Sequence, residues 1–242
     1  MRRSRRTWLV LGGSLAVSLV VVTLLARAAW IDRKIVRPDQ TTLEQIGVYG
    51  RVPAFSLTER SGRRVTLDDL RGLVWVVDFI YTECTETCPT QSLAFAQLQR
   101  EFAGAPGLRL VSITVDPIHD TPEVLRRYAE RYGAADRWWF LTGDKRDIYC
   151  LAQQGFHLAA ADPGASSPPA CGQAFRIGLT PAWASHGSKG LVMHSARSVL
   201  VDSAGQIRAY HLMTDPQSLK ALESNLRALL AERTTAVRGP GQ

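Results

Sequence analysis

The apolar run Val74–Ile80 limits the folds open to this chain more than any other feature of the sequence. Asp78 is its only polar residue, and a strand without regular polar positions is typical of the centre of a sheet covered on both faces. A second continuous run, Leu108–Val115, predicts another such strand, and Pro89–Phe102 between them has apolar residues at helical spacing. The order strand, helix, strand predicts an α/β fold with a parallel core.

The remaining segments complete this pattern. Asp120-Thr121-Pro122-Glu123 supplies a cap residue, an early proline and an acid, which predicts the start of a helix that runs to Tyr132. We expect further strands over Trp138–Leu141, Ser198–Asp202 and Gln206–His211, helices over Asp144–Gln154 and from Asp215 to Leu230, and a small hairpin formed by Val52–Leu57 and Val65–Leu67. This order predicts a thioredoxin-like fold, a central mixed sheet flanked by helices.

The N-terminal segment predicts a membrane anchor. Trp8–Ala26 carries no charge and has about the length of 20 residues that crosses a bilayer, with arginines before it. The positive-inside rule then leaves the N-terminus in the cytoplasm and exports the rest, which in a bacterium places the globular domain in the periplasm at the inner membrane. A cleaved signal peptide ending near Ala26-Arg27-Ala28 is the alternative. We expect a transmembrane segment over 1–31, a linker over 32–50, a domain over 51–233 and a disordered tail over 234–242.

The net charge argues against nucleic acid as a partner. The formal charge of the chain is +7, but the seven Arg and Lys residues and one Asp within residues 1–34 account for +6 of it. The exported part is therefore nearly neutral. It offers no basic stripe interleaved with aromatic residues that could follow a phosphate backbone.

Cys84 and Cys88 are the main candidates for chemistry. They lie in Thr82-Glu83-Cys84-Thr85-Glu86-Thr87-Cys88-Pro89, between a predicted strand and a predicted helix. If the helix begins near Cys88, its unpaired N–H groups and its dipole favour thiolates on both cysteines. Two thiolates suit Cu(I) or a reversible disulfide. A structural disulfide, or two cysteines that merely pack, is the alternative.

The other two cysteines flank a segment rich in Pro, Gly and Ser. We expect Cys150 and Cys171 to form a second disulfide that ties down this insert, with a second metal or redox site as the alternative.

A third copper ligand would come from outside the cysteine motif. His194 precedes the strand of the closing hairpin, and in a thioredoxin-like fold the loop entering that strand packs beside the cysteine turn. We interpret the other four histidines as surface or packing residues: His119, His157, His186 and His211. Met193 is a soft ligand beside His194, although a methionine there more often packs.

Asp78 bears the sequence relation to Cys84 that a buried aspartate bears to the first active cysteine in thioredoxins. It could accept a proton during disulfide exchange, or bond to backbone as a strand-edge residue, and we assign it no catalytic role. Asp120 can be interpreted simply as a helix cap.

Taken together, these segments resemble the Sco/SenC family. The resemblance rests on Phe79–Pro89, on Val115-Asp116-Pro117 followed by Asp120-Thr121-Pro122, and on His194-Ser195 before Leu200-Val201-Asp202 and Gly205. It covers residues 52–230 and is weakest over residues 156–190. It implies a membrane-anchored, thioredoxin-like protein that binds copper through Cys84, Cys88 and His194. It also implies a role in assembling the dinuclear copper centre of cytochrome c oxidase.

We therefore expect a non-enzymatic copper carrier whose partner is the copper-bearing subunit of cytochrome c oxidase or another copper acceptor. The alternative is a periplasmic thiol–disulfide oxidoreductase that reduces the cysteines of a partner copper site; Asp78 favours it, but a C-x3-C spacing lacks the tight C-x2-C geometry of thioredoxin-type reductants. A peroxide-reducing enzyme is a weaker alternative, because the sequence shows no recognisable pattern of a Thr or Ser and an arginine near the reactive cysteine. A sensor that acts through protein contact would need a partner, because the sequence has no output domain.

Overall fold

The fold is known from a computed structural model, which describes residues 43–158, 160–161, 192–193 and 196–238 and the single residues 21, 23, 27 and 171. The expected membrane segment lies almost wholly outside these residues. Within them, no helix is both long enough and apolar enough to cross a bilayer. The described part of the compact unit that begins at Leu43 carries the candidate site.

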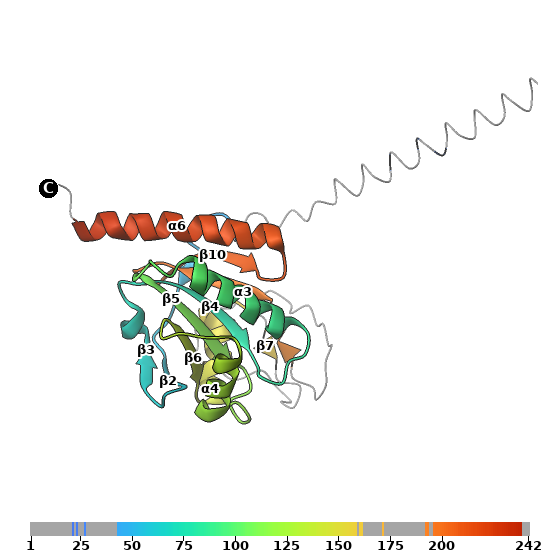
Figure 1. Ribbon diagram of the computed structural model, residues 1–242, viewed down its shortest axis with the longest axis vertical. Coiled ribbons are helices and arrows are strands. Elements are labelled where there is room, and N and C mark those ends of the chain that lie inside the picture. Colours follow the sequence, from blue (N-terminus) through green and yellow to red (C-terminus); the bar gives the residue numbers. More distant parts are fainter. Residues whose placement is uncertain are drawn as a thin grey trace, which may run out of the picture. The chain divides into compact units, whose positions relative to one another are not determined.

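An eight-stranded mixed sheet forms the centre of this unit, in the order β1-β10-β9-β4-β5-β6-β2-β3 (Figure 1). Its strands are β1 (Gly50–Arg51), β2 (Ser56–Glu59), β3 (Arg64–Thr66), β4 (Val74–Ile80), β5 (Leu108–Thr114), β6 (Trp138–Thr142), β9 (Arg197–Val201) and β10 (Gln206–Leu212). The helices are η1 (Leu67–Leu70), α3 (Thr87–Glu101), α4 (Pro122–Arg131), α5 (Lys145–Cys150), the π-helix η2 (Leu151–Gly155) and α6 (Pro216–Arg238). A separate two-stranded sheet pairs β7 (Ala160–Ala161) with β8 (Val192–Met193). This is the α/β arrangement expected from the sequence.

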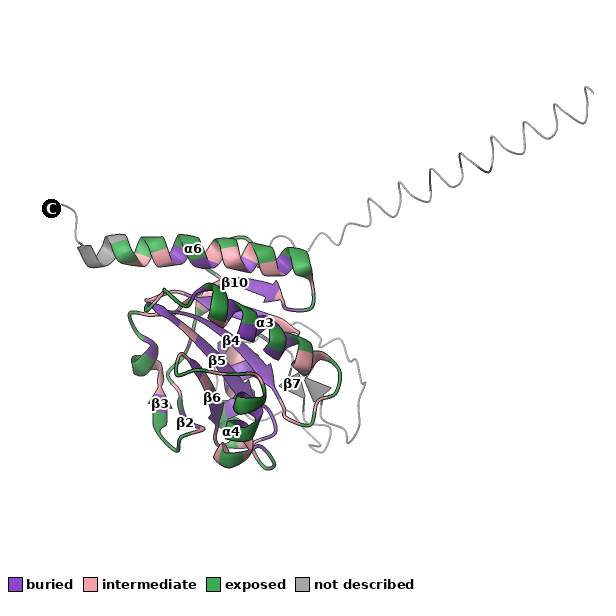
Figure 2. Ribbon diagram, viewed as in Figure 1, coloured by how far each residue is buried: buried purple, intermediate pink, exposed green. Residues whose placement is uncertain are grey.

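β4 is the central strand, as its composition predicts. It pairs in parallel with β5 and antiparallel with β9, and all seven of its residues are buried. Figure 2 shows β4 and β5 buried, while the outer sides of α3 and α6 are exposed. Because β4 is interior to the sheet, Asp78 is not a strand-edge residue.

Helices cover both faces of the sheet, and the sheet divides the hydrophobic core into two clusters. α3, α4 and α6 pack on one face, against β4 residues such as Val76 and Ile80. η2 and the residue Phe156 pack on the other, against Trp75 and Phe79. Since side chains alternate along a strand, Asp78 lies on the same face as Val76 and Ile80, which is the face of α3.

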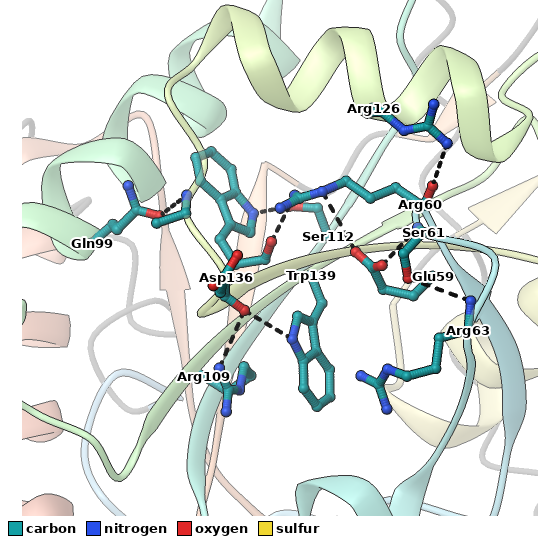
Figure 3. A network of polar contacts seen from close by, with 12 residues as sticks. Glu59, Arg60, Ser61, Arg63, Gln99, Arg109, Ser112, Arg126, Asp136 and Trp139 are labelled. Carbon is teal, nitrogen blue, oxygen red and sulfur yellow. Dashed lines mark hydrogen bonds and ion pairs between the residues drawn. The ribbon is translucent and has the colours of Figure 1, made fainter.

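The amino ends of β5 and β6 are tied to the first hairpin by arginines. Figure 3 shows Trp139 between Arg63 and Arg109, whose guanidinium carbons lie 4.7 Å and 4.6 Å from its ring centroid. The indole N–H of Trp139 donates to the carbonyl of Asp136 at 3.0 Å. This network lies at the start of the parallel strands, whereas the cysteine turn follows the end of β4, so we interpret it as structural.

Two boundaries differ from the sequence predictions. α6 continues to Arg238 rather than ending at Leu230, so it includes the first part of the segment expected to be a tail. Before β1, Tyr49 N donates to the carbonyl of Ile207 at 2.9 Å, and Asn225 Nδ2 donates to the carbonyl of Glu44 at 2.7 Å. Residues from Leu43 onward therefore belong to the folded unit, although their sequence reads as a polar linker.

Candidate metal centre

The two free cysteines lie where β4 ends and α3 begins, which is the carboxyl end of the parallel strands. Cys84 is half-buried in the connecting turn, and Cys88 is buried in the first turn of α3. The Cys88 N–H donates to the sulfur of Cys84 at 3.4 Å. Glu86, the residue before the helix, makes no side-chain cap, so the Cys84 sulfur takes the place of a capping side chain.

This geometry gives the two thiols opposite acidities. The pKa of Cys84 is lowered to about 4, chiefly because the Cys88 thiol donates a hydrogen bond to its sulfur, and the N–H groups of Cys88 and Glu86 act in the same direction. The pKa of Cys88 is raised well above its usual value, because Cys88 donates that bond and is buried beside the charge of Cys84. The structure thus favours a thiolate at Cys84 and a protonated thiol at Cys88, whereas the sequence predicts thiolates at both.

Tyr81 is a site residue that the sequence analysis did not identify. Its hydroxyl donates to the Cys84 sulfur and helps to lower the pKa of that thiol. In return, burial and the negative charge of Cys84 raise the pKa of Tyr81. The position of Tyr81, three residues before the first cysteine and just past β4, is a signal that could have found it.

Asp120 fixes the cysteine turn to the loop after β5. Its carboxylate accepts from Thr82 N at 3.1 Å, from Thr82 Oγ1 at 2.5 Å and from Thr114 Oγ1 at 2.5 Å. The interpretation of Asp120 as a helix cap is wrong, because Thr121 caps α4 through its side chain and Asp120 points back to the sheet. Burial raises the pKa of Asp120, although the bonds from Thr114 and Thr82 oppose this.

Asp78 lies beneath the pair, fully buried. Neither of its carboxylate oxygens has a hydrogen-bond partner at ordinary distance within the described residues, although Ser112 is its neighbour in the β4–β5 register. Burial raises the pKa of Asp78 to about 7. Its charge in turn contributes to the raised pKa of Cys88, so the two groups lie on one face of the sheet within electrostatic reach.

None of the histidines that the structure describes is part of this cluster. His194 lies outside the described residues. His211 is buried, with its pKa lowered to about 4 by burial, and its Nε2 is 3.2 Å from Asn225 Nδ2. His119 and His157 are exposed. In the described part of the chain, no three His, Cys, Asp or Glu side chains gather as a metal site.

Cys150 and Cys171 form a disulfide at the end of α5, with their Cα atoms 5.5 Å apart. The Gln154 side chain donates to the Cys171 carbonyl at 3.4 Å. The bridge thus uses one cysteine pair for a covalent link and leaves Cys84 and Cys88 as free thiols.

Comparison with known proteins agrees with this arrangement. The SCO1/SenC family profile matches residues 45–230. A SCO1 protein homolog of Bacillus subtilis is 37% identical over 115 residues, which cover 46% of this chain and 60% of that protein. A putative copper-binding protein of Stutzerimonas stutzeri is 26% identical over 197 residues, 79% of this chain and 83% of that protein.

A solved structure of BsSco, described as a member of the Sco family of cytochrome c oxidase assembly proteins, superimposes with a TM-score of 0.60 at 23% identity. The match covers 77% of this chain and 97% of that structure. It supports the thioredoxin-like Sco fold. The family profile spans most of the folded unit, including the cysteine turn and Asp120. The chain therefore belongs to the SCO1/SenC family.

Proposed function

We propose that the protein is a copper carrier that binds one copper ion through Cys84, Cys88 and His194. The ion would pass to the copper-bearing subunit of cytochrome c oxidase or to another copper acceptor. The observation that supports this most directly is the pair of free sulfurs at the junction of β4 and α3, where the Cys88 N–H donates to the Cys84 sulfur at 3.4 Å. Thiolates are the soft ligands that Cu(I) prefers, and an added imidazole makes a site that also accepts Cu(II).

The position of the pair suits a carrier. Cys84 is partly exposed, so an incoming or receiving ligand can reach it, whereas Cys88 is buried behind it. Copper can therefore be exchanged through one sulfur while the other retains it. Family membership and the copper-binding relative of Stutzerimonas stutzeri support the same cargo.

A copper titration of the reduced protein under anaerobic conditions tests this proposal. We expect one equivalent to bind to the parent, and binding to weaken sharply in Cys84→Ser, Cys88→Ser and His194→Ala. His157→Asn is the matched control, because His157 is exposed and its φ of 52° is one that asparagine tolerates. Unchanged Cu(II) spectra and affinity in His194→Ala would remove the histidine from the ligand set.

The second candidate is a thiol–disulfide oxidoreductase, which the unequal acidities favour. The Cys84 thiolate would attack a partner disulfide and form a mixed disulfide. Cys88 would then lose its proton and attack Cys84, which releases the reduced partner and leaves a Cys84–Cys88 disulfide. Turnover that requires both cysteines and survives His194→Ala, together with no tight copper binding, would support this function over the carrier.

A further inference from the structure

A histidine that the proposed copper site does not use lies in the loop after β5. His119 Nδ1 is 2.7 Å from Oδ2 of Asp116; the aspartate side chain is buried, and the imidazole side chain is 67% exposed. The carboxylate favours the tautomer with its proton on Nδ1, which leaves the lone pair on Nε2. His119 therefore presents a basic nitrogen at the surface.

The loop holds this imidazole in a fixed place. The N–H groups of His119 and Asp120 both donate to the carbonyl of Asp116, at 3.2 Å and 2.9 Å, and close a tight turn. Asp120 is bonded in turn to Thr82, two residues before Cys84. His119 thus lies on a loop that is tied directly to the cysteine turn, at the same end of the sheet.

The tip of the loop is directed outward. Ile118, beside His119, is 67% exposed, one of the few large apolar side chains so exposed in the described chain. An exposed apolar residue and an exposed imidazole therefore lie on the loop that Asp120 bonds to the cysteine turn.

A carboxylate that bonds one ring nitrogen while the other stays free is the arrangement found for histidines that bind metals. Imidazole is a suitable ligand for copper. His119 does not belong to a closed site, since the described residues contain no group of three metal-ligating side chains. A single protein ligand binds weakly, and weak binding suits a ligand that must release the ion.

We propose that His119 Nε2 is a transient copper ligand at the rim of the thiol site, which takes the ion as it passes between Cys84 and a donor or acceptor. This inference rests on the proposed carrier function. Each step is a ligand exchange: a bond from copper to the donor ligand breaks as the bond to Nε2 forms, and this bond is then replaced by one to the Cys84 sulfur. Copper keeps its oxidation state throughout.

The test compares the rate of copper uptake with the affinity. Stopped-flow mixing of the full-length reduced chain with the Cu(I) complex of bicinchoninate follows the loss of the complex. We expect His119→Ala to slow transfer about tenfold with an unchanged end point, and Asp116→Asn to slow it less. His157→Asn, an exposed histidine outside the site, should transfer at the parental rate.

A second measurement separates the two proposals. In the Cys84→Ser/Cys88→Ser variant, Cu(II) should broaden the His119 ring-proton signals at lower concentration than those of His157. Parental transfer rates in His119→Ala, with tight binding at the thiols intact, would overturn the role of His119 alone. A parent that takes no copper from the complex would overturn the carrier function and this inference with it.

Discussion

At the scale of single residues, one proton distinguishes Cys84 from Cys88. The Cys84 sulfur receives hydrogen bonds from Cys88 and Tyr81, and the pKa of Cys84 falls to about 4. Cys88 is buried, and its raised pKa keeps the thiol protonated until a metal ion displaces the proton. Copper that binds both sulfurs must displace that proton, so uptake at neutral pH should be accompanied by acidification of the solution.

Alkylation should reveal this difference. We expect iodoacetamide at pH 6 to modify Cys84 and to spare Cys88, because the thiolate fraction of Cys84 grows as the pH rises through about 4 and is complete above it. Peptide mass spectrometry after a short pulse reads both sites. In Cys88→Ala the midpoint for Cys84 should move to higher pH, since the donated S–H is lost. Equal labelling of both cysteines in the parent would contradict the assignment.

Asp78 should make the domain less stable as the pH rises. Its folded pKa of about 7 lies above the unfolded value near 3.8, so the folded state holds a proton that the unfolded state has lost. The resulting decrease in the free energy of unfolding begins above pH 4, is complete above pH 7 and amounts to roughly 4 kcal/mol. Denaturant unfolding of Asp78→Asn should show its largest gain over the parent near pH 8 and little gain near pH 4. Asp136→Asn, an exposed acid, is the control.

At the scale of elements, the loop after β5 and the cysteine turn behave as one unit because Asp120 joins them. The sequence marks Asp120 as part of a motif but cannot say which way it points. In the sequence, an aspartate that caps a helix cannot be distinguished from one that bonds to a neighbouring loop, because Thr121 follows as a second possible cap. Only the register of β4 with β5, which brings Ile80 beside Thr114, places Thr82 within reach of the carboxylate.

Asp120→Asn should weaken this junction, because the amide offers a donor where the carboxylate accepted three bonds. We expect the free energy of unfolding to fall by about 1–3 kcal/mol, and copper uptake at Cys84 to slow. Glu123→Gln, an exposed acid in the first turn of α4, should change neither. Parental stability and copper uptake in Asp120→Asn would show that the bonds of Asp120 do not stabilise the cysteine turn.

The elements with strong sequence patterns were predictable. β4 and β5 are buried on both faces and read as continuous apolar runs, and α3 and the β9–β10 hairpin follow ordinary periodicity and turn signals. β1 was not, because two residues at a sheet edge carry no pattern and depend on β10. The hydroxyl of Tyr81 was missed for a related reason: its role depends on where the turn folds back onto Cys84.

At the scale of the whole molecule, the Cys150–Cys171 disulfide closes a loop of sequence separation 21. We expect Cys150→Ser/Cys171→Ser to lower the free energy of unfolding by about 3 kcal/mol, chiefly by freeing the unfolded chain. Copper affinity at Cys84 and Cys88 should stay the same, because that pair lies at the start of α3. Urea unfolding and copper titration of the double variant check both; a loss of copper binding would link the bridge to the site.

One domain thus holds a bridged cysteine pair and a free pair, and this restricts what can supply its electrons. Cys150 and Cys171 are both only partly buried, so burial does not shield their bond from an attacking thiol. Any reductant that keeps Cys84 and Cys88 as free thiols must nevertheless leave that bond intact. Such a reductant must either have a potential between those of the two cysteine pairs or select its target by fitting the surface around the cysteine turn.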